Sequence, residues 1–209
     1  MTTMTVIGAG RMAAAIAGIA VRADADVQVI ARDGEKAANL AAKVGANVKH
    51  GAIGDPLFGD IVVLAVPYQT VSDVIDAYAS QLADKTLVEI SNPVDYVTFD
   101  GLVVPPDSSA AAQLAAQVPE ATVIKAFNIN FAETLKTGMN GPNITTVVLA
   151  GNDRSAKRAL GQLVEAAGMR VIDAGSLSRA RELEALGYLQ VALASHEKTS
   201  WKSGFALLP

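Results

Sequence analysis

Two glycines near the N-terminus could bring a phosphate group close to the backbone. Gly8, Ala9 and Gly10 follow the apolar run 5–7, and Arg11, Met12 and Ala13 open an Ala-rich run without proline. This order of residues predicts a strand, a tight turn and a helix. Gly8 permits the turn, Gly10 has no Cβ to hold a pyrophosphate away, and Ala13 lets helix and strand pack closely. We expect residues 8–13 to bind the pyrophosphate of a dinucleotide at the helix N-terminus. The alternative is a purely structural small-residue turn.

The residues after the second predicted strand bear on the choice of dinucleotide. Proteins that bind NAD usually place a carboxylate there to accept hydrogen bonds from the ribose 2′-hydroxyl. Here the position holds Arg32, and Lys36 follows one helical turn later. A guanidinium pairs with the extra phosphate of NADP, which a carboxylate would repel. We therefore expect Arg32 and Lys36 to bind the 2′-phosphate of NADP(H). Two alternatives stay open: both residues are solvated charges, or Asp33 is a displaced ribose acceptor.

Three further strand ends should lie at the same edge of the sheet as the glycine turn. They end in Val66-Pro67, in Asn92-Pro93 and in Ala126, the last followed by Phe127 and Asn128. Ligands of open α/β sheets bind at the carboxyl edge, so these loops are expected to form the floor under the nicotinamide. Asn92 could donate its amide to the carboxamide or cap a turn. Asn128 is expected to face the cleft, and Phe127 to lie in the core.

No protein catalytic residue is expected, because hydride transfer between two bound rings needs correct orientation of the rings and exclusion of water rather than a nucleophile. The chain has no cysteine and two histidines, His50 and His196, neither of which has metal-ligand spacing. We expect structural or surface roles for both histidines and no metal site. Ser91 and Ser109 lack the context of a nucleophile elbow.

The spacing of apolar residues predicts the elements that must position these groups. Strands alternate with helices along the whole chain, which indicates an α/β protein of the Rossmann type: a doubly wound, mostly parallel sheet with helices on both faces. After the first βα pair, strands are expected at 27–31, 47–50, 61–65, 86–90, 122–126, 145–150 and 170–173. Helices are expected at 35–44, 70–79, 109–118, 153–167 and 179–195, and residues 133–143 are expected to be irregular or a short helix.

Length and composition favour one α/β domain over residues 1–209, with a dinucleotide-binding core at 1–128 and a C-terminal part, 129–209, that extends the sheet and closes the cleft. Hydrophobic residues make up 51% of the chain and aromatic residues 5%, which suits a buried parallel sheet under Ala-rich helices. The net charge of −4 argues against nucleic acid or an anionic membrane as a partner. The early start of the first strand and the lack of a long apolar run predict a cytoplasmic protein.

Together these motifs resemble the coenzyme F420-dependent NADP oxidoreductase family, the deazaflavin-dependent NADP reductases, which share a domain with the six-transmembrane metalloreductases. The resemblance covers nearly the whole chain. It rests on residues 7–13, Arg32 with Lys36, the strand ends 65–67, 91–93 and 123–128, the helix start 108–111, and the segments 150–153 and 173–177.

The resemblance implies an NADP(H) oxidoreductase that passes a hydride to or from a second redox ligand stacked on the nicotinamide, either deazaflavin coenzyme F420 or a flavin. It also implies a homodimer formed through the C-terminal region. The segment from Phe127 to Asn130 resembles the metalloreductase branch more than the His-containing segment of the deazaflavin reductases. Two other functions remain open: an NADPH-binding sensor without turnover, and a reductase of small imines related to pyrroline carboxylate reductases.

Overall fold

The computed structural model describes residues 2–207 and contains one eight-stranded sheet with helices on both faces. The strand order is β10-β9-β6-β5-β4-β1-β2-β3. The strands are β1 (Thr3–Ile7), β2 (Asp26–Ala31), β3 (Lys49–Ala52), β4 (Ile61–Leu64), β5 (Thr86–Glu89), β6 (Thr122–Ala126), β9 (Thr146–Gly151) and β10 (Arg170–Asp173). In this spatial order, all neighbouring strands from β6 to β3 pair in parallel, and so do β9 and β10. Within the eight-stranded sheet, only β6 and β9 are antiparallel. The predicted fold class, a Rossmann-type doubly wound sheet, is confirmed.

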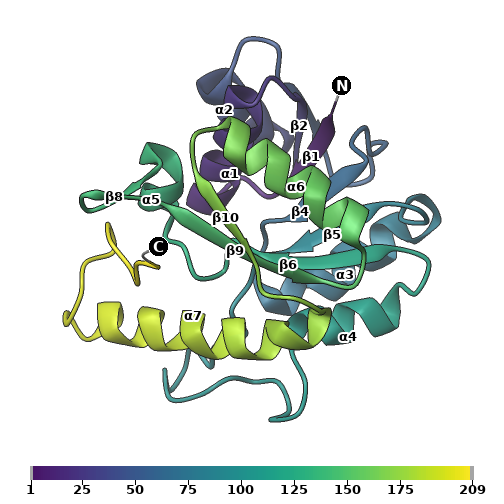
Figure 1. Ribbon diagram of the computed structural model, residues 1–209. Coiled ribbons are helices and arrows are strands. Elements are labelled where there is room, and N and C mark those ends of the chain that lie inside the picture. The colour runs from purple at the N-terminus through teal and green to yellow at the C-terminus, as the bar shows by residue number, and fades with distance from the viewer. Residues whose placement is uncertain (1, 208–209) are drawn as a thin grey trace.

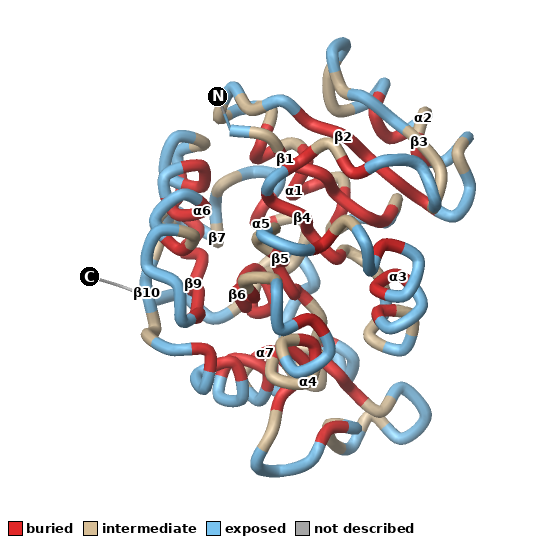
Figure 2. Tube along the Cα trace, turned by 90° about the vertical axis from the view of Figure 1, so that its right-hand side faces the viewer, coloured by how far each residue is buried: buried red, intermediate tan, exposed pale blue. Residues whose placement is uncertain are grey.

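Helices form two layers around the sheet (Figure 1). One layer contains α1 (Arg11–Arg22), α2 (Gly34–Val44), α5 (Ala132–Thr137) and α6 (Arg154–Ala166), whose apolar side chains share one core cluster. The other contains α3 (Val71–Tyr78), α4 (Ala110–Gln117) and, across the carboxyl ends of β5 and β6, α7 (Ala180–Ser195). Buried residues concentrate along the central strands between these layers, as Figure 2 shows.

Most differences from the predicted elements lie at their ends, and two are larger. The third strand, predicted at 47–50, lies at Lys49–Ala52, because its register is set by pairing with β2 at Ile30 and Ala31 rather than by its own weak strand propensity. The segment predicted as irregular or a short helix, 133–143, contains α5 and then the first strand of a hairpin, β7 (Met139–Asn140) with β8 (Asn143–Ile144). The left-handed Gly138 ends α5, as glycine commonly does at helix C-termini.

The last helix, α7, attaches to the sheet through an unusually polar face. Its buried residues include Glu184, Gly187 and Gln190, which recur every three positions and so face the same way. Gln190 donates to the carbonyl oxygen of Ile129 at 3.1 Å. Gly187 lies directly against the Asn92 amide, where a Cβ would come within 2.3 Å of Oδ1. The position of α7 is therefore set by hydrogen bonds and one close approach in addition to the apolar packing of Ala180, Leu183 and Ala194.

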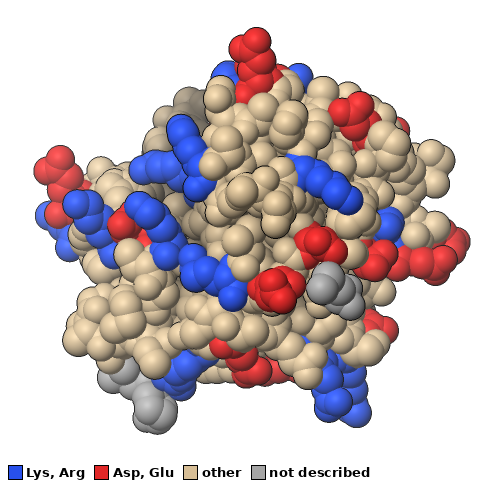
Figure 3. Space-filling view, turned by 90° about the horizontal axis from the view of Figure 1, so that it is seen from above, with Lys and Arg blue, Asp and Glu red and all other residues tan. Residues whose placement is uncertain are grey.

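Charged side chains of both signs are interspersed on the face shown in Figure 3. Within residues 2–207, no helix combines the length and the apolar character needed to cross a bilayer. Trp201 packs against Phe131 in a tilted arrangement, with ring centroids 5.1 Å apart. Together with Phe205, whose amide donates to Gln190, it folds the C-terminal segment back onto α7 and α5.

Two glycine-to-alanine substitutions in helix interiors should change stability in opposite directions. Gly187→Ala forces α7 away from Asn92, and we expect a net loss of about 1–3 kcal/mol of unfolding free energy because the clash outweighs the gain in helix propensity. In Gly161→Ala, on α6, the new methyl meets its nearest neighbour, Val171, at 3.5 Å. This control should gain about 0.5–1 kcal/mol.

Urea unfolding of the two variants and the parent measures both changes. Equal effects of the two substitutions would show that the approach of α7 to Asn92 does not limit the packing of this helix.

Candidate functional site

The glycine turn between β1 and α1 brings bare backbone to the carboxyl edge of the sheet. Gly8 has φ +134° and donates its N–H to the Ile30 carbonyl, and a Cβ there would lie 2.2 Å from the carbonyl oxygen of Ala65. Only glycine fits between these strands. Gly10 is different: it is exposed, and a Cβ added to it would meet nothing within 4 Å. Its lack of a side chain is therefore not required by packing within the described chain.

The N-terminus of α1 has the features of an anion site. Among the described residues, no side chain caps this end, and its first turn has no acidic residue. The amides of Arg11, Met12 and Ala13 thus lack the capping that α2, α4 and α6 obtain from side chains. The helix dipole adds partial positive charge at the same point. This arrangement fits a pyrophosphate lying over Gly10.

The basic residues after β2 lie at the same edge, next to β1. Arg32 follows the last residue of β2 and is exposed, as is Lys36. Asp33 accepts hydrogen bonds from the amides of Glu35 and Lys36 and so caps α2, with its other oxygen 3.7 Å from Lys36 Nζ. Because its carboxylate caps α2, Asp33 is a weaker candidate for the residue that binds a ribose.

Sequence reasoning missed a second lysine beside this edge. A depression of about 260 Å³ is lined by Ala9, Lys36, Asn39, Leu40 and Lys43. Lys43 follows Lys36 by seven residues, two helical turns, so the spacing alone could have placed both on one face of α2. The depression runs from the glycine turn along α2.

The other predicted loops meet beside β4, β5 and β6, but their side chains differ in accessibility. Val66 and Pro67 are partly or fully exposed, whereas Pro93 is buried and Ala126 is fully buried. The prediction that Phe127 lies in the core is confirmed, because it has no exposed surface.

The two asparagines predicted to face the cofactor hydrogen-bond to each other. Asn92 Nδ2 donates to the Asn128 carbonyl, and Asn128 Nδ2 donates to Asn92 Oδ1, both at 2.8 Å. Asn128 Nδ2 also donates to the carbonyl of Leu183 on α7, and the residue is only 5% exposed. The structure thus directs the Asn128 amide toward α7, while its predicted contact with a cofactor stays a prediction.

Sequence reasoning also missed a buried charge cluster under the loop 91–93. Lys125 Nζ contacts Glu89 Oε2, the Ser91 carbonyl and Glu184 Oε1, the last at 2.8 Å. All three charged side chains are at most 1% exposed. Glu89 and Lys125 are paired neighbours on β5 and β6, and each is a lone charge in an apolar strand, a signal that was visible in the sequence. Glu184 reaches them from α7 and was not identifiable by spacing.

Glu184 also binds the start of α4. Its carboxylate accepts hydrogen bonds from the amides of Ala110 and Ala111 at 2.9 and 3.3 Å. Burial raises the pKa of Glu184, and the nearby Glu89 carboxylate raises it further, although Lys125 and the Ala110 amide act in the opposite direction. The protonated form of Glu184 is therefore easier to populate than that of an exposed glutamate.

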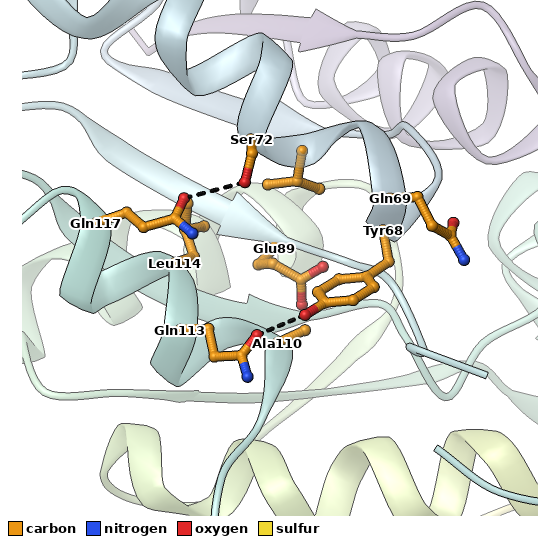
Figure 4. Close-up of a pocket in the computed structure, with 9 residues that line it drawn as sticks. Tyr68, Gln69, Ser72, Glu89, Ala110, Gln113, Leu114 and Gln117 are labelled. Atoms are coloured by element: carbon orange, nitrogen blue, oxygen red, sulfur yellow. Dashed lines mark hydrogen bonds between the residues drawn. The ribbon is translucent and has the colours of Figure 1, made fainter. Parts of the chain in front are cut away.

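A small cavity of about 170 Å³ lies beside the cluster, between the start of α3 and α4 (Figure 4). Tyr68 donates its hydroxyl to Gln113 Oε1 across this cavity, with the Glu89 carboxylate beside it. Burial raises the pKa of Tyr68, and the charges of Glu184 and Glu89 raise it further. The Tyr68 hydroxyl is therefore harder to ionise than that of an exposed tyrosine.

The residues that could serve a metal do not gather. Within residues 2–207, no group of three or more His, Asp or Glu side chains has metal-binding geometry. His196, exposed at the end of α7, places Nδ1 2.8 Å from the Ala192 carbonyl oxygen. The arrangement as a whole offers an anion-binding turn, a basic edge and a buried acidic cluster along one edge of the sheet.

Comparison with known proteins finds relatives among NADP-dependent reductases and metalloreductases. The chain is 30% identical over 139 residues to an F420-dependent NADP reductase of Methanocaldococcus jannaschii, covering 65% of this chain and 62% of the relative. It is 30% identical over 182 residues to the rat metalloreductase STEAP3, covering 87% of this chain and 35% of the relative. The chain thus spans less than two thirds of either relative.

A solved structure agrees over the full length. An Arthrobacter sp. FB24 protein, proposed to be an F420-dependent NADP reductase, superposes with a TM-score of 0.85 at 25% identity and covers 99% of both chains. Residues 3–93, which contain the glycine turn, Arg32, Lys36 and the loop ends at 66–67 and 91–93, match the family described as NADP oxidoreductase coenzyme F420-dependent. The match agrees with the resemblance to this family that the sequence motifs predict, and the relative from M. jannaschii and the Arthrobacter structure agree with it too.

Proposed function

We propose that the protein is an NADP(H)-dependent oxidoreductase that transfers a hydride between NADP(H) and a second redox ligand. The observation that carries the proposal is the space over Gly10. A glycine that packing does not require lies at an uncapped helix N-terminus, so a bound pyrophosphate explains both features. The match of residues 3–93 to the family of coenzyme F420-dependent NADP oxidoreductases supports the same activity.

The residues along the sheet edge divide the binding of the cofactor between them. Gly8 would form the turn, the backbone amides from Ala9 to Ala13 would hold the pyrophosphate, and Arg32 with Lys36 would hold the 2′-phosphate by charge-assisted hydrogen bonds. The loops at Val66-Pro67, Asn92-Pro93 and 126–128 would position the nicotinamide. In this last group, Asn92 and Asn128 would act mainly by fixing the loops, since their amides already pair with each other.

The chemistry itself belongs to the cofactor, which supplies the hydride when bound. The protein contributes orientation and exclusion of water. Helix α7 covers the carboxyl ends of β5 and β6 through Glu184, Gly187 and Gln190, which keeps Lys125 and Asn128 away from water. The second ligand we propose is a deazaflavin or flavin, and the functional unit we propose is a homodimer.

Replacing Gly10 separates binding from folding. Gly10→Ala should leave the unfolding free energy nearly unchanged, because the methyl group points into open space. It should lower the affinity for NADPH at least about tenfold, equivalent to about 1.4 kcal/mol of binding free energy, because the methyl group holds the pyrophosphate away from the backbone amides. Isothermal titration of NADPH measures this. Gly161→Ala is the matched control and should bind like the parent, and an unchanged affinity of Gly10→Ala would remove the pyrophosphate from this turn.

Arg32 should determine the preference for the phosphorylated cofactor. Arg32→Ala removes charge-assisted hydrogen bonds to the 2′-phosphate, so NADPH affinity should fall about 10- to 100-fold while NADH affinity changes little. Arg158→Ala, on the exposed side of α6, removes the same charge elsewhere and should affect neither cofactor. An equal loss for NADPH and NADH in Arg32→Ala would contradict the assignment.

A panel of electron acceptors tests which second ligand the protein reduces. NADPH oxidation should be measured with coenzyme F420, with flavins and with ferric chelates, and we expect turnover with deazaflavin or flavin. Tight NADPH binding without oxidation by any acceptor would instead favour a sensor, the second function left open by the sequence. Turnover of a cyclic imine would indicate an imine reductase, although only the 3-10 helix Leu177–Arg179 and α7 follow β10 within residues 2–207.

A further inference from the structure

The buried cluster of Glu89, Lys125 and Glu184 does not balance its charges. Two carboxylates face one ammonium, and each of the three side chains is almost completely removed from water. A buried net negative charge is costly, and taking up one proton removes it. The amides at the start of α4 and the amide and hydroxyl of Ser91 also donate to the cluster, and they offset only part of the charge. The remaining titratable group that faces it, Tyr68, donates its hydroxyl to Gln113 instead.

One member of the cluster is connected to the surface. Glu89 Oε1 accepts hydrogen bonds from both the hydroxyl and the amide of Ser91. Ser91 is partly exposed and begins the loop 91–93, which we propose to lie under the nicotinamide and the second ligand. Tyr68 is a poorer proton source, because burial and the two glutamates raise the pKa of its hydroxyl above the usual value for tyrosine.

The proposed reaction needs a proton as well as a hydride. NADPH gives up one hydrogen nucleus with two electrons and becomes NADP⁺, and an acceptor that becomes neutral after two-electron reduction must also take up one H⁺. The loop 91–93 lies where this proton would be needed.

We propose that the Glu89–Lys125–Glu184 cluster stores one proton and delivers it through the Ser91 hydroxyl to the ligand reduced at the loop 91–93. This rests on the proposed oxidoreductase function. The Ser91 hydroxyl turns from Glu89 to the reduced ligand and gives it its proton, and Oγ takes up one proton from the cluster through Glu89 Oε1, the atom that it contacts. The cluster then has both carboxylates ionised and recovers its proton from water. The reverse sequence accompanies oxidation of the reduced ligand.

Infrared spectroscopy of the full-length protein without cofactor tests the store directly. At neutral pH, where an exposed glutamate with a pKa of about 4.3 is ionised, the parent should show the C=O stretch of a protonated carboxyl. Glu89→Gln and Glu184→Gln each leave one carboxylate opposite Lys125, so each should abolish the band. Glu182→Gln, an exposed neighbour on α7, is the matched control and should retain it. Absence of the band in the parent, or its persistence in both variants, overturns the proposal.

Ser91 variants test the delivery. Ser91→Ala should keep the infrared band and the NADPH affinity but slow acceptor reduction about 100-fold, the usual scale for loss of a proton donor, with a larger solvent deuterium isotope effect. Ser91→Thr retains a hydroxyl and should restore the rate. An unchanged rate in Ser91→Ala overturns the relay. If the parent shows the band but oxidises NADPH with no acceptor, the stored proton is supported and the proposed function fails, so the two failures are distinguishable.

Discussion

A single ammonium group, Lys125 Nζ, joins four separate parts of the fold. It contacts a carboxylate on β5, a carbonyl in the loop that follows, and a carboxylate on α7 that also caps α4. No apolar side chain could replace it without leaving two buried carboxylates facing each other, and removing one partner of a buried ion pair typically costs about 3–5 kcal/mol. The loops at the carboxyl edge of the sheet therefore take their positions from a charge interaction that lies beneath them.

The close packing at Gly8 imposes a different constraint. β1 and β4 approach so closely there that no side chain fits, and the chain must turn at once into α1. Gly10, two residues later, has no such neighbour. The first glycine thus serves the fold and the second is free to serve a ligand, although the sequence pattern shows both with equal weight. The two roles can be told apart only from the structure, which shows what an added Cβ would meet at each glycine.

Sequence periodicity predicted the parts of the fold that depend on local pattern. The strands 122–126 and 170–173 have the predicted bounds because their apolar runs end in clear turn signals. The docking of α7 could not be predicted, since its buried face mixes Glu184 and Gln190 with apolar residues. Its hydrogen-bond partners on α4 and after β6 lie 55 or more residues away in sequence. Likewise, the glycine turn and Arg32 were visible in sequence, whereas the charge cluster depends on a strand pairing and a helix crossing that no local pattern encodes.

The carboxyl edge of the sheet has two electrostatic halves, and this polarity would select the direction in which a dinucleotide lies. Over β1 and β2 the edge presents uncapped amides, Arg32 and Lys36, all of which attract phosphate. Over β5 and β6 the ammonium of Lys125 is fully buried and already bound by Glu89 and Glu184, so it offers no partner to a phosphate. A cofactor lying the other way would exchange Arg32 and Lys36 for this neutralised cluster. The half whose charges are already paired is also the half that contains the proposed proton store, so one cluster can serve both the orientation of the cofactor and the chemistry of its uncharged end.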